Sequence, residues 1–426
     1  MSKDTLAYPL MFRLKQRFRC STIDDVSSTV EAELANLVLN KKVHAGESVA
    51  VACGSRRIAN HAVILKAVVD HFKGLKARPF LVPAMGLDAG GTAEGQLRAL
   101  SMLGITEGTV GAEIRSCMDA EVVGHLPEGV PVYCDRNALA ADHIFAVNRV
   151  RPHSGLDGEV QSGLLKMLAM GLGKEVGARV YHSAVVTMPF ADLARGAWKV
   201  FLDKGRLLAG LMLVENGQSE TTRIQATPAE NFADAERKML RYAQTVFPRL
   251  PFRFIDILLV DEMGTVFGCH GVDLNVVGRK QATNGTGREE SPRIRTLVFR
   301  DLHPAAMGNA IGLGHADLVR SRLVRKMDPG TTRLNALALT IPSLAAIPMD
   351  FETDRAILDA GLSMAPLQPS EKARIVWIRN TSSLAEFECS EPFLEEVTHW
   401  KDLIVASQLH PPDFDSEGNL RDFVIG

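Results

Sequence analysis

Short apolar runs alternate along the chain with longer amphipathic stretches. In the first part of the chain, apolar runs at residues 47–52 and 78–83 predict strands, and the stretches at 58–73 and 92–103 predict helices. Strand followed by helix at this spacing is typical of βαβ units, which build a parallel sheet. Thr92 suits the N-cap position of the second helix.

The remaining pattern extends the α/β organisation to the end of the chain. Further strands are predicted at residues 130–134, 143–147, 180–188, 255–260, 293–299 and 373–378. Further helices are predicted at residues 29–40, 196–202, 228–247, 315–327 and 353–362, with Thr227 as the N-cap of the third. A polar stretch at residues 280–290 predicts a surface loop, and residues 248–251 are the best candidate linker. We therefore predict the α/β fold class, with two α/β domains over residues 1–250 and 251–426 that each contain a parallel-rich sheet.

Two glycine-containing loops follow the strands predicted at 47–52 and 78–83. Both begin at the carboxyl edge of the sheet, where open parallel sheets bind ligands. In the first loop, Ser55 and Arg56 offer a hydroxyl and a guanidinium to a phosphate or carboxylate. The glycines match neither the dinucleotide-binding spacing nor the phosphate-loop spacing. Asp88 in the second loop is a base, a group linked to a metal, or a turn residue.

A helix that is apolar almost all round carries a single charge. Residues 164–172 have the pattern of a buried helix, and Ser162 can cap it. Lys166 lies in the first turns of this helix, and His182 follows sixteen residues later. The lysine is either a helix-edge residue whose ammonium reaches water or a group used chemically. His182 is either a satisfied core histidine or a ligand.

His153 lies in an arginine-containing loop that follows the strand predicted at 143–147. A base at this position would lie near the ligand edge of the sheet. The alternative is an ordinary surface histidine.

Composition excludes some classes of function. The 426 residues, 46% hydrophobic and 23% charged, suit a soluble protein of two or three domains. A formal net charge of -2 argues against a nucleic-acid-binding surface spread over the whole protein. The N-terminus resembles neither a signal peptide nor a membrane span, and six scattered cysteines match neither a disulfide framework nor a zinc motif. We expect a cytoplasmic protein without nucleic-acid or membrane partners, and the sequence leaves its oligomeric state open.

Five motifs resemble, in the same order, those of proteins related to nickel-pincer-nucleotide-dependent lactate racemase. They are GSRRIAN at 54–60, VPAMGLDAGGTAEGQ at 82–96, RPHSGLDGEVQSGLLKMLAMGLGK at 151–174, GVDLNVVGR at 271–279 and MGNAIGLGHAD at 307–317. Together they extend over most of the chain. The resemblance implies two α/β domains with the active site in the cleft between them.

The resemblance also implies a cofactor, pyridinium-3-thioamide-5-thiocarboxylic acid mononucleotide, whose two thio-carbonyl arms clamp nickel (Ni). In lactate racemase a lysine is joined to one arm and a histidine is the fourth nickel ligand, at the spacing of Lys166 and His182. A square-planar site with soft donors suits Ni(II). The cofactor-binding residues implied here are Lys166, Ser55, Arg56, Gly163 and Asn309, and the implied metal ligand is His182.

The implied reaction moves the α-hydride of a hydroxy acid to the cofactor and returns it to the opposite face, which requires two bases. His153 matches one base of the family, and Asp88 stands where the family has the second histidine. The unperturbed pKa of an aspartate is about 3.9, against about 6.5 for histidine, so Asp88 is the weaker base at neutral pH. Arg56 matches a residue that contacts substrate carboxylate or cofactor phosphate.

Three further positions depart from the family pattern. Cys53 stands in place of an acid, Arg57 in place of a glycine, and Thr265 in place of a lysine. An added charge beside Arg56 favours a more anionic substrate.

The sequence therefore predicts an isomerase, a racemase or epimerase of a small α-hydroxy acid, sugar acids included. One alternative is a nicotinamide-dependent oxidoreductase, against which the missing dinucleotide-binding glycine motif weighs. The other is a non-catalytic relative that binds an anion or cofactor, which Asp88 favours.

Overall fold

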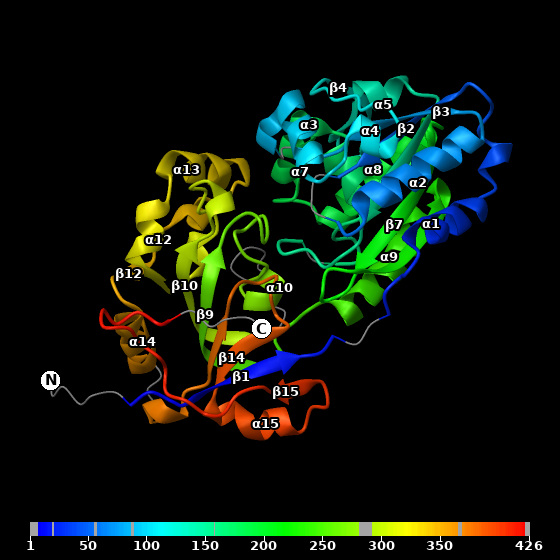
Figure 1. Cartoon of the computed structure of the whole chain (residues 1–426). Helices are drawn as coiled ribbons and strands as arrows, with labels where there is room; N and C mark the ends of the chain where they lie inside the picture. Colours follow the sequence, from blue (N-terminus) through cyan, green and yellow to red (C-terminus); the bar gives the residue numbers. More distant parts are fainter. Residues whose placement is uncertain are drawn as a thin grey trace. The chain divides into compact units, whose positions relative to one another are not determined.

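The structure is a computed structural model that describes residues 7–18, 21–54, 58–86, 89–156, 158–280, 292–364 and 369–421 (Figure 1). The chain divides into two compact units: Cys20–Phe247, and Met1–Arg19 together with Pro248–Gly426. The N-terminal strand β1 (Met11–Gln16) belongs with the later unit because it pairs with strand β14 (Glu386–Ser390). The sequence pattern that predicted domains over 1–250 and 251–426 did not indicate this pairing.

The unit formed by Cys20–Phe247 contains a five-stranded sheet. Its strands, in spatial order, are β3 (Arg78–Pro83), β2 (Ser48–Cys53), β6 (His143–Arg149), β7 (Leu207–Glu215) and β8 (Thr221–Pro228). The first four are parallel, and β8 is antiparallel to β7. Strands β4 (Ala120–His125) and β5 (Pro131–Asp135) form a separate antiparallel pair.

Helices cover both faces of this sheet. The helices are α1 (Val26–Ala35), α2 (His61–Gly74), α3 (Ala93–Met102), α4 (Glu107–Val110), α5 (Arg136–Ala140), α6 (Leu164–Lys166), α7 (Lys174–Ala184), α8 (Phe190–Asp203) and α9 (Phe232–Val246). A π-type turn, η3 (Met167–Gly171), links α6 to α7, and short 3-10 turns occupy Leu39–Lys41, Ala89–Gly91 and Ala229–Asn231. Alternate residues of a strand point to opposite faces. Val49 and Val51 of β2 therefore pack in one core with α1 and α2, whereas Ala50 and Ala52 pack in another with α6, α8 and α9.

The other unit contains an eight-stranded sheet. Its strands, in spatial order, are β12 (Met349–Phe351), β11 (Leu318–Arg320), β10 (Arg293–Leu302), β9 (Phe254–Met263), β13 (Ile375–Ile378), β14, β1 and β15 (Leu403–Val405). The strands from β12 to β13 are parallel, and the last three pair antiparallel. The helices are α10 (Leu274–Val277), α12 (Ser321–Lys326), α13 (Pro329–Ala338), α14 (Asp354–Ser363) and α15 (Leu394–Thr398). Short 3-10 turns occupy Pro304–Ala306, Leu313–His315, Pro342–Ala345, Ser370–Lys372 and Glu391–Phe393.

The predicted α/β class with parallel-rich sheets is confirmed, and several element predictions are corrected. Residues 180–188 do not form a strand: helix α7 extends to Ala184, because the buried ring of Tyr181 packs in the core, which overrides the local strand preference. Residues 315–327 divide into a 3-10 turn, β11 and α12. Residues 228–231 end β8 and form a short turn, so α9 begins only at Phe232, with Asn231 and not Thr227 at its N-cap position.

Two further predictions concern loops and membrane contact. The polar stretch at 280–290 lies, beyond its first residue, outside the described residues. In the described parts of the chain, no helix combines the length and apolar character needed to cross a bilayer. The five cysteines within those parts are all free.

A buried ion pair fastens the start of α7. The Lys174 Nζ atom lies 2.9 Å from Oδ2 of Asp135, and both side chains are 0% exposed. The same ammonium donates to the Pro83 carbonyl oxygen at 2.5 Å and to Gln96 Oε1 at 3.2 Å. The Gln96 amide in turn donates to the Gly86 carbonyl at 3.3 Å. This network holds α7 against the first residues of the loop that follows β3.

We expect Lys174→Met to lower the free energy of unfolding by about 3–5 kcal/mol, because it leaves the Asp135 carboxyl group buried without its cation. Lys42→Met is the matched control: its pair with Glu230 is exposed, 52% and 61%, and such pairs contribute at most about 1 kcal/mol. Urea unfolding of the three proteins measures both changes. Equal losses in the two variants would contradict the structural role of the buried pair.

Candidate functional site

The carboxyl ends of the parallel strands of Cys20–Phe247 meet at a topological switch point. The chain passes from β2 to β3 on one side of β2 and later returns to β6 on its other side. The register pairs Cys53 with both Pro83 and Val147, so β2 and β3 end at the same level and β6 extends beyond them to Arg149. Open α/β sheets bind ligands in the crevice at such a point. The candidate site therefore lies where the loops after β2, β3 and β6 begin.

The long connection from β6 to β7 is fastened to this edge. The Asn148 side-chain amide, at the end of β6, donates to the Gly163 carbonyl at 2.7 Å. The Gly86 backbone N–H, after β3, donates to the Gly171 carbonyl at 3.3 Å. Gly171 also permits a close approach, since a Cβ there would lie 2.6 Å from the Ala84 carbonyl oxygen. These contacts fix the segment between Gly163 and Gly171, which contains Lys166.

Lys166 is the last residue of α6 and directly precedes the π-type turn. The turn is closed by the Leu172 N–H, which donates to the Met167 carbonyl at 2.8 Å. Residues 164–172 other than Lys166 are buried, which confirms the predicted apolar segment, and Lys166 itself is partly exposed. Single π-type turns are rare and are found mostly at functional sites.

The Lys166 amine contacts the His153 imidazole. Its Nζ atom lies 2.6 Å from His153 Nε2, and the Gly155 backbone N–H donates to the Nδ1 atom at 3.0 Å. Because Nδ1 accepts a hydrogen bond, a neutral ring carries its proton on Nε2, facing the lysine. In this arrangement Lys166 is the acceptor, and it can accept only as a neutral amine. The loop is held in place by the His153 N–H, which donates to Gln161 Oε1 at 2.9 Å.

His182 lies on α7 and is half-buried. Burial lowers the pKa of His182 from 6.5 to about 4, with a smaller contribution from the positive charge of Lys166 whenever that amine is protonated. The imidazole is therefore neutral at physiological pH, as a metal ligand must be. Within the described ranges, no residue hydrogen-bonds its ring.

These residues fit the implied cofactor in their donor chemistry. Across the described residues, no three His, Cys, Asp or Glu side chains are placed together to hold a metal ion. The Lys166 amine could attach such a cofactor, and the neutral His182 imidazole could bind its metal. Both residues lie on one continuous segment.

The other predicted site residues are placed less completely. Ser55, Arg56 and Asp88 lie outside the described residues. Gly163 directly precedes α6 with φ 125°, a conformation that favours glycine. Asn309 belongs to the other unit, where its Oδ1 accepts from the Ile311 N–H at 3.2 Å. The roles predicted for these five residues stay predictions.

Sequence reasoning missed Glu236. This residue of α9 is 0% exposed, and its Oε2 atom accepts from the Leu165 N–H at 3.0 Å, one residue before Lys166. Its position could have been noticed in the sequence, since Glu236 falls on the apolar stripe formed by Ala235, Met239 and Leu240.

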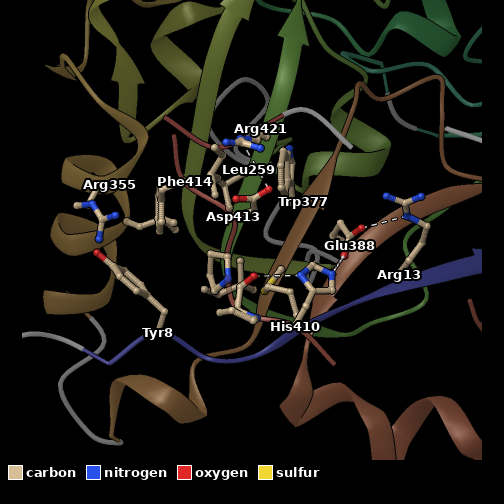
Figure 2. A pocket seen from close by; sticks show the side chains of 16 residues that line it. Tyr8, Arg13, Leu259, Arg355, Trp377, Glu388, His410, Asp413, Phe414 and Arg421 are labelled. Atoms are coloured by element: carbon tan, nitrogen blue, oxygen red, sulfur yellow. Dashed lines mark hydrogen bonds and ion pairs between the residues drawn. The ribbon is translucent and has the colours of Figure 1, made fainter. Parts of the chain in front are cut away.

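A cavity of about 730 Å³ lies in the other unit, and its described lining includes no predicted site residue (Figure 2). One row of paired positions across four neighbouring strands, Leu259, Trp377, Glu388 and Arg13, contributes to its lining. His410 also lines it, with Nε2 3.4 Å from Glu388 Oε2.

The fold resembles that of a known protein. No protein-family model matches the chain, and no curated protein sequence matches it. The structure of the lactate racemase apoprotein from Thermoanaerobacterium thermosaccharolyticum is similar, with a TM-score of 0.54 and 13% identity over 90% of this chain and 95% of that one. A crystal structure of a Thermotoga maritima protein has a TM-score of 0.49 and 17% identity, over 66% and 72% of the two chains, which is too weak a likeness for an argument. The chain has a lactate racemase-like fold.

The lowered pKa of His182 predicts how acid affects stability. The folded protein binds the proton of His182 only near pH 4, whereas the unfolded chain binds it near pH 6.5. His182 therefore destabilises the folded state progressively as pH falls from 6.5 to about 4, and has no such effect above 6.5.

We expect His182→Gln to lose less stability than the natural chain over that range, as measured by urea midpoints at a series of pH values. His399→Gln, at an exposed position, is the control and should follow the natural chain. Coincident curves for His182→Gln and the natural chain would show that the imidazole is not buried as described.

Proposed function

We propose that this protein is an isomerase that racemises or epimerises a small α-hydroxy acid, sugar acids included, with a nickel-pincer nucleotide as cofactor. The observation that carries the proposal is the contact between Lys166 and His153, with His182 following on the same segment, at the switch point of a lactate racemase-like fold. When bound, the cofactor would supply a hydride acceptor and donor at the α-carbon of the substrate.

In this proposal Lys166 attaches the cofactor and His182 binds its nickel. A lysine is an effective nucleophile only as the neutral amine. The hydrogen bond from His153 Nε2 favours that form, and the contacts of Gly163 and Gly171 hold the amine in place. His182 contributes a neutral imidazole, because burial has already disfavoured its protonated form.

His153 also serves as one base for the substrate. The Nε2 atom faces the side where the Lys166 amine lies, so the ring exchanges protons with a substrate through this atom. To act as a base, the ring must present an unprotonated Nε2, which places its own proton on Nδ1 and releases the Gly155 N–H. A substrate hydroxyl bound on that side could then give its proton to Nε2 and recover it there.

The remaining roles are assigned to residues beyond the described ranges. We assign the second base to Asp88, and the orientation of a substrate carboxylate or cofactor phosphate to Arg56 with Ser55. The loop that contains Asp88 starts from Ala84, next to Gly171 of the π-type turn. Gly163 and Asn309 stay proposed cofactor contacts, and the cleft between the two domains stays the predicted location of the active site.

Covalent attachment is tested by mass. The protein, co-expressed with enzymes that synthesise the cofactor, should show an intact mass increased by one cofactor and should contain nickel. Lys166→Ala should lose the adduct because no amine remains, and Lys204→Ala, at an exposed position, is the control that should keep it. An unmodified mass without nickel in the natural chain would refute the cofactor assignment.

The reaction is tested with single enantiomers of α-hydroxy acids deuterated at the α-carbon. The loaded protein should form the opposite configuration with the deuterium retained, since a hydride that returns to the same carbon does not exchange with water. Asp88→His should turn over severalfold faster near pH 7, because a histidine base has a pKa near 6.5. A slower Asp88→His variant would instead identify the aspartate as a working base.

Two results would favour the alternatives. Tight binding of free nicotinamide dinucleotide with net oxidation would indicate an oxidoreductase. A loaded protein that converts no hydroxy acid would indicate a binding protein.

A further inference from the structure

Glu236 is a fully buried acidic residue that the proposed reaction does not use. It lies on α9, 0% exposed, in the core that covers one face of the five-stranded sheet. Burial raises the pKa of Glu236 to about 8, and hydrogen bonds from the N–H groups of Leu165 and Leu164 act in the opposite direction. No charged side chain contributes to this shift, so the carboxyl group faces the start of α6 and apolar packing.

The carboxyl group occupies the capping position of the Lys166 turn. The first N–H groups of a helix have no partner within the helix and are usually satisfied by the N-cap side chain. Here the N-cap residue is Gly163, which has no side chain. Glu236 supplies the cap from another helix, with Oε2 3.0 Å from the Leu165 N atom.

Gly163 and Glu236 fit each other closely. A Cβ on Gly163 would lie 2.5 Å from Glu236 Oε2 and 2.6 Å from its Cδ, so any residue larger than glycine would clash with the carboxyl group. The Gly163 carbonyl is held at the same time by the Asn148 amide, at 2.7 Å. The backbone just before Lys166 is thus fastened to β6 on one side and to α9 on the other.

We propose that Glu236 is a positioning residue for Lys166: by capping the turn from which this lysine projects, it keeps the amine against His153. The chemical use of that amine rests on the proposed function, whereas the positioning itself does not. Glu236 touches neither the amine nor the imidazole in the described contacts, so its effect passes through the backbone of Leu164 and Leu165.

The test measures the reactivity of the Lys166 amine without any cofactor. Pyridoxal 5′-phosphate forms an imine with neutral lysine amines, and borohydride reduces the imine to a stable secondary amine. Mass spectrometry of the Lys166 peptide gives its labelling rate, referred to the peptide of the exposed Lys204 in the same sample.

Glu236→Leu should label Lys166 about tenfold more slowly, the effect expected when a buried hydrogen bond is lost and the amine leaves His153. Glu236→Gln, whose amide oxygen can accept the same N–H, should restore most of the rate. Met239→Ala is the matched control, because it shortens a buried side chain of α9 and leaves the Glu236 cap intact. The Lys166 labelling rate of this variant should equal that of the natural chain.

Gly163→Ala provides a second variant should Glu236→Leu not fold. The added Cβ pushes the carboxyl group away from the turn, so Lys166 labelling should slow here too, and adding Glu236→Ala should not restore the rate, because the cap is still absent. Unchanged labelling in Gly163→Ala together with slow labelling in Met239→Ala would overturn the proposal, because general packing and not the cap would then control the amine.

The two proposals fail separately. Slow labelling in Glu236→Leu with no cofactor adduct in the natural chain would refute the proposed function and keep the positioning role. A normal adduct in the natural chain with unchanged Lys166 labelling in the folded Glu236→Leu protein would refute the positioning role and keep the proposed function.

Discussion

The peptide unit at Gly163 is the constraint on which the rest of the site depends. Its carbonyl is bound by Asn148 from β6, and the N–H groups that follow it are bound by Glu236 from α9. Both partners are anchored in elements that pack in the same core. A residue that projects from the next turn is therefore placed by the sheet and by a helix together, as precise chemistry requires. Lys166 is that residue.

Burial has a second effect at this site, on protonation. The same packing that holds the π-type turn removes water from His182 and lowers its pKa to about 4. Burial in the core on the opposite face of the sheet raises the pKa of the Cys53 thiol, at the end of β2, to about 12. This thiol therefore stays protonated near pH 7, although it lies directly before the loop that contains Ser55 and Arg56.

The sequence predicted the elements whose pattern is local and missed those that depend on distant partners. Strand 78–83 and the Thr92 cap were found because apolar runs and capping residues act over a few positions. Strand β1 was missed because its partner, β14, lies more than 370 residues further along the chain. The strand predicted at 180–188 was wrong because tertiary burial of Tyr181 outweighed the preference of its β-branched neighbours. The burial of Glu236 could be read from the apolar stripe of its own helix, but its contact with the Lys166 turn could not, since nothing in the sequence near Leu165 indicates a carboxyl group 71 residues away.

Two lysines on the same segment, Lys166 and Lys174, have very different surroundings. Lys174 has what a structural lysine needs: 0% exposure, a carboxylate at 2.9 Å and two further oxygen acceptors. Lys166, eight residues earlier, is partly exposed and lies against a ring nitrogen whose tautomer is set by the Gly155 N–H. An imidazole N–H stabilises a lysine only in its neutral form, which is the costly form for an amine in contact with water. That arrangement suits the nucleophilic role that the proposed function gives to Lys166.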